Sequence, residues 1–356
     1  MTPAHPCPSA PPRSSPPGAA NSQASEGVGG FSGTVDYRVI IGDCIEGIRT
    51  LPDQSVHTCV TSPPYFGLRD YGMAGQIGLE DTPDAFVARL VDVFREVRRV
   101  LRDDGTLWLN LGDSYSAQGG AQVQGTKQAK GSQSGAWGGE SRKGVAGLKH
   151  KDLIGIPWRV AFALQADGWY LRQDIIWHKP NPMPESVRDR CTKAHEYVFM
   201  LSKSARYFFD AEAIREPVSD NDVTRARNNR ADKGIVGPAD LHGTGFGQSG
   251  KGGWERAGVA TRNRRSVWTV ATKPYAGAHF ATFPPDLIEP CILAGSPVGG
   301  TVLDPFGGSG TTAGVAMRNG RNAILCELNP EYAALIPARI ADLGGNQPDL
   351  FMRAAE

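Results

Sequence analysis

The feature that most constrains the fold is a glycine-rich turn close to the carboxyl end of the chain. A short apolar run ends at Asp304, the turn spans 305–310, and a helical pattern opens at Thr311. This order of strand, glycine turn and helix lets backbone approach a ligand at the carboxyl end of a parallel sheet. Glu327 ends the next apolar run about 20 residues further on, where an acidic side chain can bind ribose hydroxyls.

The position of this turn limits how the sheet is completed. Only 29 residues follow Glu327, too few for the further strand–helix units of a dinucleotide-binding fold. The segment 308–313 fits the Gly-x-Gly-x-x-Ala pattern of a nicotinamide dinucleotide site, but its position argues against that alternative. We therefore expect the missing strands to come from the amino-terminal half of the chain.

The rest of the chain supplies the expected alternation of strands and helices. A helical pattern between Thr82 and Asp104 carries one apolar stripe, formed by Phe86, Leu90, Phe94, Val97 and Leu101. Apolar runs predict strands over 37–41, 56–61, 106–111, 170–177, 196–201, 301–303 and 322–326, and further helices over 154–166, 312–318 and 331–341. Such an alternation indicates an α/β fold with a mostly parallel, doubly wound sheet.

Three stretches do not join this alternation. Residues 1–30 are rich in Pro, Ser, Ala and Gly without an apolar core segment, which predicts a disordered tail and not a signal peptide. Residues 115–151 and 219–265 are rich in Gly and basic or amide side chains. Long inserts of this kind inside a compact domain are usually functional or disordered.

Charge and cysteine content narrow the classes of function. A formal net charge of +1 over 356 residues argues against general coating of nucleic acid, so any polyanion site must be local. The six cysteines include no Cys-x-x-Cys pair, so we expect neither a zinc site nor a disulfide framework. A reducing cytoplasm is the expected location. No segment predicts a membrane span, and we expect no bound metal.

A second motif, Ser62-Pro63-Pro64-Tyr65, follows the apolar run 56–61. The exocyclic amine of a nucleobase is a poor nucleophile because its lone pair is delocalised into the ring. Acceptors around its two N–H groups localise that pair, and the Ser62 hydroxyl and Pro63 carbonyl are suitable acceptors. The two prolines fix the backbone, and Tyr65 can stack on a base rotated out of a duplex. Taken alone, the motif also fits an ordinary turn.

In this order and at this separation, the two motifs resemble those of the beta-group DNA amino-methyltransferases, which modify cytosine N4 or adenine N6. The resemblance covers roughly 37–115 and 154–341. It implies a circularly permuted, Rossmann-like sheet that uses S-adenosyl-L-methionine and carries an inserted target-recognition region. The chain then divides into the disordered tail 1–30, a catalytic half at 31–215 with a flexible basic insert at 115–151, a target-recognition insert at 216–268 and a cofactor-binding half at 269–356.

The resemblance assigns the cofactor to residues at both ends of the chain. It implies that Glu327 binds the ribose, that Asp43 contacts the adenine and that 279–284 pack over the cofactor; a simple turn cap is the alternative for Asp43. The methionine side is expected to be lined by Asp304, Phe306, Gly308 and Thr311. The expected cofactor-binding residues are together Asp43, Cys44, His279, Phe283, Pro284, Asp304, Pro305, Phe306, Gly307, Gly308, Ser309, Gly310, Thr311, Thr312 and Glu327.

The expected catalytic residues are Ser62, Pro63, Pro64 and Tyr65. Transfer to a ring carbon would need a nucleophilic cysteine, but Pro6-Cys7 lies in the expected tail and Pro290-Cys291 inside an expected helix. Direct transfer to nitrogen is therefore favoured. In the resembling family a serine at the first motif position accompanies cytosine-N4 activity more often than adenine-N6 activity, so Ser62 favours cytosine N4, with adenine N6 as the alternative.

The resemblance implies double-stranded DNA as a partner, in a restriction–modification setting that allows a cognate restriction endonuclease as a second partner. A monomer and a homodimer both remain open. Candidate contacts to DNA are Arg69, Lys179, Arg188, Arg262, Arg264 and Arg265. A surface ion pair is the alternative for Arg69, and a solvated face for Lys179 and Arg188. The rival classes are an RNA or small-molecule amine methyltransferase and a non-catalytic DNA-binding module.

Overall fold

The computed structural model describes residues 35–68, 70–116, 147–218, 261–272 and 283–345. The expected tail, the central parts of both inserts, Arg69 and His279 lie outside these residues.

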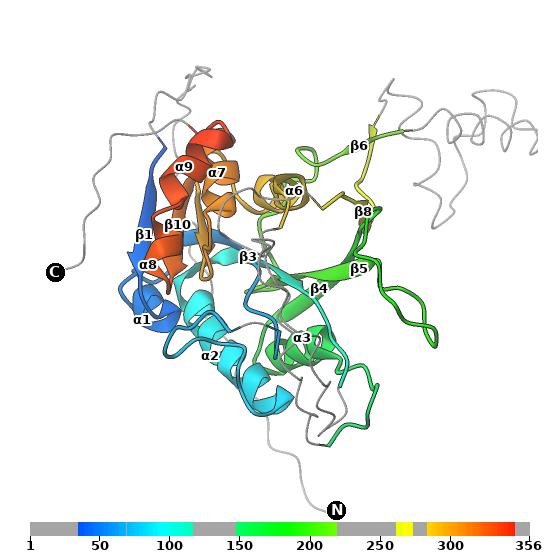
Figure 1. Ribbon diagram of the computed structural model, residues 1–356. Helices are drawn as coiled ribbons and strands as arrows, with labels where there is room; N and C mark the ends of the chain where they lie inside the picture. Colours follow the sequence, from blue (N-terminus) through cyan, green and yellow to red (C-terminus); the bar gives the residue numbers. More distant parts are fainter. Residues whose placement is uncertain (1–34, 69, 117–146, 219–260, 273–282, 346–356) are drawn as a thin grey trace, which may run out of the picture. The chain divides into compact units, whose positions relative to one another are not determined.

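One eight-stranded sheet forms the centre of the described part, in the strand order β1-β10-β9-β2-β3-β5-β4-β8 (Figure 1). Its strands are β1 (Tyr37–Ile41), β2 (Val56–Thr61), β3 (Leu101–Leu111), β4 (Tyr170–His178), β5 (His195–Ser202), β8 (Val267–Thr269), β9 (Thr301–Asp304) and β10 (Asn322–Glu327). From β1 to β3 neighbouring strands are parallel, whereas β5 is antiparallel to both β3 and β4. A separate antiparallel pair joins β6 (Glu216–Pro217) to β7 (Thr261–Arg262).

The carboxyl-terminal strands β9 and β10 lie between the amino-terminal strands β1 and β2. In the register of this parallel block, Ile41 pairs with Glu327 and Cys59 with Leu303. The expected closure of one sheet from both ends of the chain is therefore confirmed. As a result, the carboxyl tips of four strands that are distant in sequence meet at one edge.

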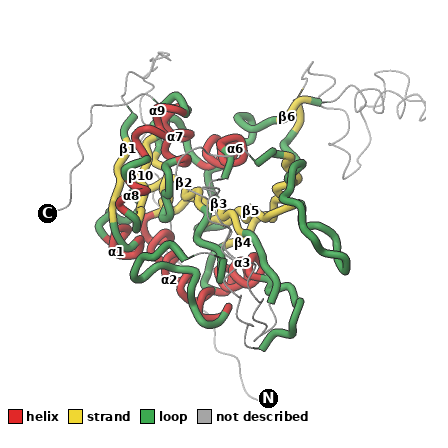
Figure 2. Tube along the Cα trace, in the orientation of Figure 1, coloured by secondary structure: helices red, strands yellow, loops and turns green. Residues whose placement is uncertain are grey.

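Helices cover both faces of the sheet (Figure 2). One face packs against α1 (Cys44–Arg49), α2 (Pro83–Val100) and α3 (Ile156–Ala166). The other packs against α6 (Pro285–Gly295), α7 (Thr311–Arg318) and α9 (Ile336–Asp342), while the short α8 (Pro330–Ala333) follows β10. This is the doubly wound arrangement expected from the sequence. No helix in the described ranges is long and apolar enough to cross a membrane.

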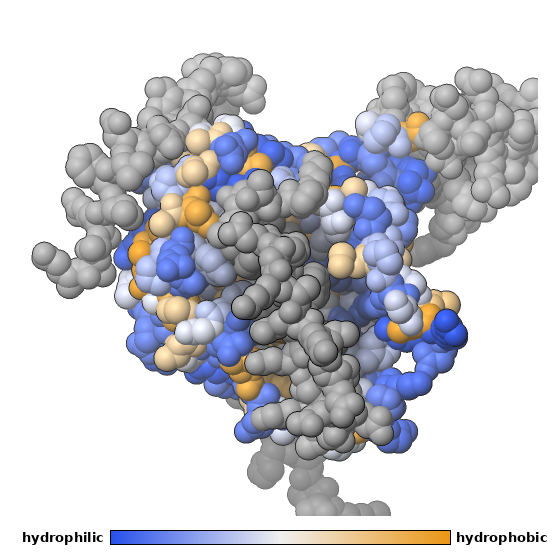
Figure 3. Space-filling model, in the orientation of Figure 1, coloured by the Kyte–Doolittle hydropathy of each residue, from blue (hydrophilic) through white to orange (hydrophobic). Residues whose placement is uncertain are grey.

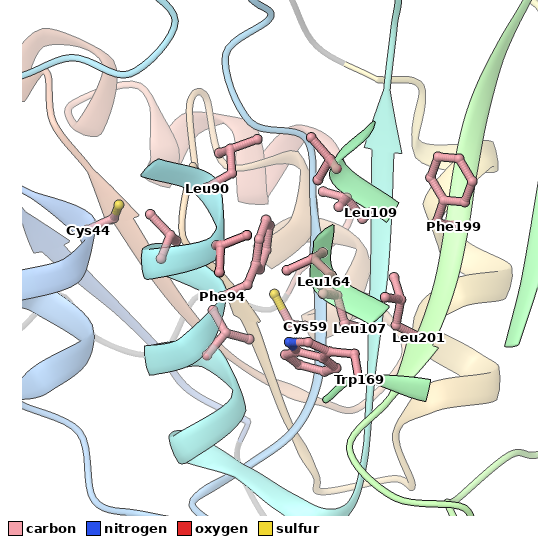
Figure 4. Packing of buried hydrophobic residues seen from close by; sticks show 14 of the residues in the cluster. Cys44, Cys59, Leu90, Phe94, Leu107, Leu109, Leu164, Trp169, Phe199 and Leu201 are labelled. Atoms are coloured by element: carbon pink, nitrogen blue, oxygen red, sulfur yellow. The ribbon is translucent and has the colours of Figure 1, made fainter. Parts of the chain in front are cut away.

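Helix α2 shows how the apolar pattern builds the core. The Thr82 hydroxyl accepts a hydrogen bond from the Ala85 amide at 3.1 Å and so caps the first turn. Leu90 and Phe94 are fully buried, and Figure 4 shows them pointing toward Leu109 and its neighbours in the sheet. Burial of each such side chain contributes about 1.5–3 kcal/mol, so this stripe fixes α2 beneath the strand tips.

The largest differences from the expected element boundaries are at two helices. The pattern predicts a helix between Thr82 and Asp104, but α2 ends at Val100: Leu101 is already extended, with ψ of 140°, and as the first residue of β3 it pairs with Val56 of β2. Strand β3 is therefore longer than the predicted 106–111, and its register with β2 shifts before Thr58 pairs with Thr106. The helix predicted over 331–341 is two helices, α8 and α9, because Pro337 in the first turn of α9 has no amide to continue the earlier helix.

Candidate active site

The sheet changes winding direction between β9 and β2. Strand β9 leads into α7 on one face, whereas β2 leads toward α2 on the other. Ligands of open α/β sheets bind in the crevice that such a point creates at the carboxyl ends of the strands. A cavity that is open to solvent lies here and is lined by the segments after β1, β2, β9 and β10.

Ten of the site residues expected from the sequence line this cavity. All four residues of the motif Ser62-Pro63-Pro64-Tyr65 do so. The lining residues from the expected cofactor set are Asp43, Cys44, Pro305, Phe306, Gly308 and Glu327. The two motifs, more than 200 residues apart in the chain, therefore face one space.

Asp304 organises the turn from behind and does not line the cavity. Its buried carboxylate accepts hydrogen bonds from the hydroxyls of Thr61 and Thr312, both at 2.6 Å, and from the Phe306 amide at 3.0 Å. Burial raises the pKa of Asp304, and these three hydrogen bonds oppose that shift only in part. Asp304 thus ties β2, β9 and α7 together.

Glycines allow the turn to pack this closely. A Cβ on Gly307 would lie 2.8 Å from the Leu325 Cβ, and one on Gly310 would lie 2.8 Å from the Ile336 Cγ2. Gly310 also has φ of 90°, which side-chain-bearing residues rarely adopt. Both positions therefore need glycine for packing against β10 and α9.

Glu327 presents its carboxylate at the tip of β10. Its Oε2 accepts from the Gly308 amide and its Oε1 from the Asn329 amide, each at 2.8 Å. Burial raises the pKa of Glu327 despite these two hydrogen bonds. A carboxylate oxygen accepts more than one hydrogen bond, so Glu327 can also accept from hydroxyl groups of a ligand in the cavity.

Other expected cofactor residues lie behind the lining. The hydroxyls of Ser309 and Thr311 are buried and have no hydrogen-bond partner among the described residues. A buried hydroxyl left unpaired costs about 1–3 kcal/mol, so these two groups suit a polar partner from outside that set. Phe283 packs against the core cluster of α6 and α7, and Pro284 precedes α6; neither lines the cavity.

Asp43 caps a helix, which is the alternative expected for it, and also faces the cavity. Its Oδ1 accepts from the amides of Ile45 and Glu46 at 2.9 and 3.1 Å, so it caps α1, and its Oδ2 lies 3.3 Å from Arg89. It also lines the cavity. Next to it, burial and the charge of Asp43 raise the pKa of Cys44 to about 12, so this thiol is protonated at neutral pH.

The cysteines described here give no support to a covalent enzyme intermediate. Burial raises the pKa of Cys326, which lines the cavity beside Cys44. Cys291 lies inside α6, as expected, and burial raises its pKa as well. No cluster of three or more His, Cys, Asp or Glu in the described part is arranged to hold a metal ion.

The part of the cavity lined by Ser62–Tyr65 is built around Tyr65. Its hydroxyl donates to the Glu196 Oε2 at 2.6 Å and lies 3.4 Å from the Asn110 Oδ1. Burial and the Glu196 carboxylate hold the pKa of Tyr65 well above its ordinary range, and a hydrogen bond with the Ser62 side chain opposes them in part. Glu196 also forms an ion pair with Lys179.

The described residues that were expected to contact DNA differ in exposure and in their interaction partners. Lys179 is paired with Glu196 and largely buried, so it does not lie on a solvated face. Arg188 is exposed and has no hydrogen bond or ion pair with any described residue. Arg262 and Arg265 both pair with Glu216, at 2.8 and 2.6 Å. The Arg264 guanidinium lies 4.7 Å from the centre of the Trp268 ring.

Several residues at the cavity were not identified from the sequence. Tyr71 and Tyr332 line it, with ring centres 6.4 Å apart in an edge-to-face arrangement. Glu196 sits behind Tyr65, and the only local signal for it is a charged residue at the start of an apolar strand. Asn329, which follows Glu327 and caps α8, had a clearer signal because Asn before Pro is typical of a helix start.

Comparison with known proteins places the chain in a family. The DNA methylase family model for N6 and N4 enzymes matches residues 56–337. The type II methyltransferase M.SmaI of Serratia marcescens is 47% identical over 312 residues, covering 85% of this chain and 90% of the relative. M.XycI of Xanthomonas campestris pv. cyanopsidis is 48% identical over 307 residues, covering 86% and 88%.

Solved structures agree on the fold. The PvuII DNA methyltransferase, which is cytosine-N4-specific, matches with a TM-score of 0.54 at 20% identity, over 89% of this chain and 98% of that one. A protein of Thermus thermophilus in complex with S-adenosyl-L-methionine matches with a TM-score of 0.52 at 24% identity, over 86% and 94%. From the family model and the close relatives together, we conclude that this chain belongs to the N6/N4 DNA methylase family.

Proposed function

We propose that this DNA methylase transfers a methyl group from S-adenosyl-L-methionine to the N4 amine of a cytosine rotated out of duplex DNA. The observation that carries the proposal is that Ser62–Tyr65 and Glu327 line one cavity at the carboxyl edge of the sheet. A DNA-binding module without catalysis would have no need to join an acceptor motif for an amine to a glycine-rich ligand turn.

The family uses S-adenosyl-L-methionine as its methyl donor, and the residues of this cavity fit it. Glu327 has acceptor capacity for the ribose hydroxyls, and Asp43 lies on the side assigned to the adenine. Phe306 and Gly308 line the side assigned to the methionine. The unpaired hydroxyls in the turn supply further polar groups. When bound, the cofactor provides a methyl group activated by a positively charged sulfur.

The task of the motif after β2 is to present the amine. The Ser62 hydroxyl and the Pro63 carbonyl can accept the two N–H groups, which draws the nitrogen lone pair away from the ring and toward the methyl donor. Pro63 and Pro64 fix φ of the backbone that carries these acceptors. Tyr65 offers an aromatic face against which the rotated base can stack.

The preference for cytosine rests on Ser62. A hydroxyl both donates and accepts, so it can contact the cytosine amine and also the ring N3, whereas a carboxylate at this position can only accept. The family resemblance points the same way, since serine at this position more often accompanies N4 activity. Adenine N6 is the alternative product.

DNA contact is proposed for the loop between β4 and β5. This loop, drawn in green, extends away from the sheet at the right of Figure 1, and Figure 3 shows it as largely hydrophilic. It carries the exposed, unpaired Arg188 and the exposed Met183. Arg190 braces the loop, with its guanidinium 4.0 Å from the centre of the Tyr115 ring and an ion pair to Glu185 at 2.7 Å. Among the described residues of this loop, Arg188 is thus the unpaired cation that can bind a DNA phosphate.

The biological setting is proposed from the close relatives. They are named type II methyltransferases, and such enzymes modify the sites that a restriction endonuclease cuts. We therefore propose a cognate endonuclease as the partner in the cell.

The oligomeric state is a separate question, because the proposal allows both a monomer and a homodimer. Light scattering during size-exclusion chromatography distinguishes these two states.

The function is tested by supplying labelled S-adenosyl-L-methionine with amplified, unmodified duplex DNA, with RNA of the same sequence, or with free nucleosides. We expect labelling of duplex DNA alone, with N4-methylcytosine found by mass spectrometry of the hydrolysed product. N6-methyladenine as the sole product would overturn the choice of base. Labelling of RNA or nucleosides alone would contradict the assignment of DNA as the substrate. Absence of cofactor binding by calorimetry would contradict the assignment of the protein as an enzyme.

A further inference from the structure

Glu196 lies beside the acceptor motif because of the antiparallel course of β5. The strand enters the sheet next to the carboxyl end of β3, where Tyr197 pairs with Leu111. On its other side Glu196 pairs with Trp177, near the carboxyl end of β4. The first residues of β5 are therefore placed at the same edge of the sheet as the tip of β2, although they are distant in sequence.

Both oxygens of the Glu196 carboxylate are engaged. Oε2 accepts the Tyr65 hydroxyl at 2.6 Å and lies 3.3 Å from the Asn110 Nδ2. Oε1 pairs with the Lys179 ammonium. Only 15% of the Glu196 side chain and 18% of the Lys179 side chain are exposed, so solvent screens this pair far less than an ordinary surface pair.

The Tyr65 ring is also confined along its edge. A Cβ on Gly112 would lie 2.4 Å from the Tyr65 Cε2, closer than real Cβ atoms approach. Gly112 follows β3, so the backbone at the end of that strand serves as a stop for the ring. The Tyr65 side chain is thus confined at its hydroxyl, where Glu196 makes the shortest contact and Asn110 and Ser62 lie close by, and at its edge by Gly112.

The ion pair is poorly explained by stability alone. A largely buried pair loses hydration, and an apolar pair of the same volume is often as stable or more stable. The Lys179 ammonium also lies 4.2 Å from the centre of the Trp177 ring, which fixes the cation from a second direction. The arrangement supplies orientation, and the group it orients is the Tyr65 hydroxyl.

We propose that Glu196 is a positioning residue for methyl transfer, which holds the Tyr65 ring in the plane that receives the target base, and that Lys179 fixes the Glu196 carboxylate. This inference rests on the proposed function, in which the base stacks on Tyr65. It assigns Lys179 to the amine site in place of the DNA backbone. A ring fixed before the base arrives loses little freedom on stacking, and so favours the reactive geometry.

A double-mutant cycle tests the inference with Tyr65→Phe, Glu196→Gln and the combined variant, on amplified duplex DNA with labelled S-adenosyl-L-methionine. If Glu196 acts through the Tyr65 hydroxyl, each single change lowers kcat about tenfold, and the combined variant is no slower than the slower single variant. The dissociation constant of the cofactor stays unchanged. Losses in kcat that multiply in the combined variant would overturn the inference.

Gly112→Ala provides a second test that removes no polar group. Its new methyl group displaces the Tyr65 ring, so we expect a lower kcat with unchanged cofactor affinity and a folded protein by circular dichroism. Wild-type kcat in a folded Gly112→Ala protein would contradict the confinement of the ring. This variant keeps the inference testable even if Glu196→Gln fails to fold.

The matched control is Glu96→Gln on α2. Glu96 pairs with Arg99 at 2.9 Å and its side chain is 21% exposed, but it lies outside the cavity lining. We expect wild-type kcat for this variant, and an equal loss in both glutamine variants would overturn a specific role for Glu196. Inactive wild-type protein would count against the proposed function itself, whereas active wild type with an equally active Glu196→Gln would count against this inference alone.

Discussion

The two ends of the cavity are built by different means. At the end proposed to bind the cofactor, close backbone packing sets the shape, with Gly307 and Gly310 packed against β10 and α9 and the Gly308 amide bound to Glu327. At the amine end side chains set it, with Tyr65 held by Glu196, 131 residues away in sequence. The difference teaches that one cavity can join a rigid ligand turn encoded locally to an acceptor site assembled from distant strands.

This contrast sets what each end tolerates. A methyl group added at Gly307 or Gly310 meets the side chain of Leu325 or Ile336 at under 3 Å. The end built around Tyr65 depends on hydrogen bonds and charge in addition to the close approach at Gly112. Substitutions that act through volume should therefore separate from those that act through polar contacts.

The largest expected effect is at the amine end. Ser62→Ala removes a proposed acceptor for the amine, and loss of such a group typically lowers kcat by about 10²–10³-fold. Cofactor affinity should not change, because the substitution leaves the glycine turn and the Glu327 carboxylate intact. Steady-state methylation of duplex DNA and calorimetry measure the two quantities. Ser55→Ala, in the turn before β2, serves as the control, and equal kcat in both variants would remove Ser62 from the reaction.

Among changes at the end proposed to bind the cofactor, Asp304→Ala should disturb the glycine turn most directly. Asp304→Ala leaves the hydroxyls of Thr61 and Thr312 and the Phe306 amide without their acceptor. We expect the free energy of unfolding to fall by about 3 kcal/mol, together with weaker cofactor binding. Urea denaturation and calorimetry measure both. Weaker binding at unchanged stability would mean that Asp304 touches the ligand directly and that its structural role is minor.

Lowering the pH tests the role of Glu327 in cofactor binding. Burial raises its pKa above the ordinary 4.5, so on lowering the pH toward that raised value the carboxylate gains a proton and loses acceptor capacity. Cofactor binding should weaken by about 1 kcal/mol. Stability of the unliganded protein moves the opposite way, since a raised folded-state pKa stabilises at low pH and that contribution is lost as pH rises through it.

Calorimetry of cofactor binding between pH 7 and 5 measures this effect, with circular dichroism at each pH to confirm that the protein stays folded. In Glu327→Gln the group cannot titrate, so the pH dependence should be flatter and the affinity at pH 7 lower. An equally steep pH dependence in the variant would assign the titration to another group.

The same contrast explains what could be predicted from the sequence. The order of strands and helices, the closure of the sheet from both ends and the glycine turn follow from local patterns, because periodicity and glycine at fixed offsets are encoded in short windows. Asp304 was identified, but its inward orientation depends on Thr61 from another strand. Glu196 was read only as the start of a strand, since its contact with Tyr65 exists only after β5 enters the sheet antiparallel.

The smallest expected effect concerns the loop between β4 and β5. Arg188 is exposed and unpaired among the described residues, whereas Arg265 already pairs with Glu216 at 2.6 Å. If Arg188 neutralises one phosphate, Arg188→Ala lowers DNA affinity a few-fold and reduces the slope of log K against log salt by about 0.9. Arg265→Ala should change the slope less, because Arg265 must first give up its carboxylate partner. Fluorescence anisotropy with labelled duplex DNA over a salt series measures both slopes, and a larger change for Arg265 than for Arg188 would move the DNA contact from this loop to the segment around β7.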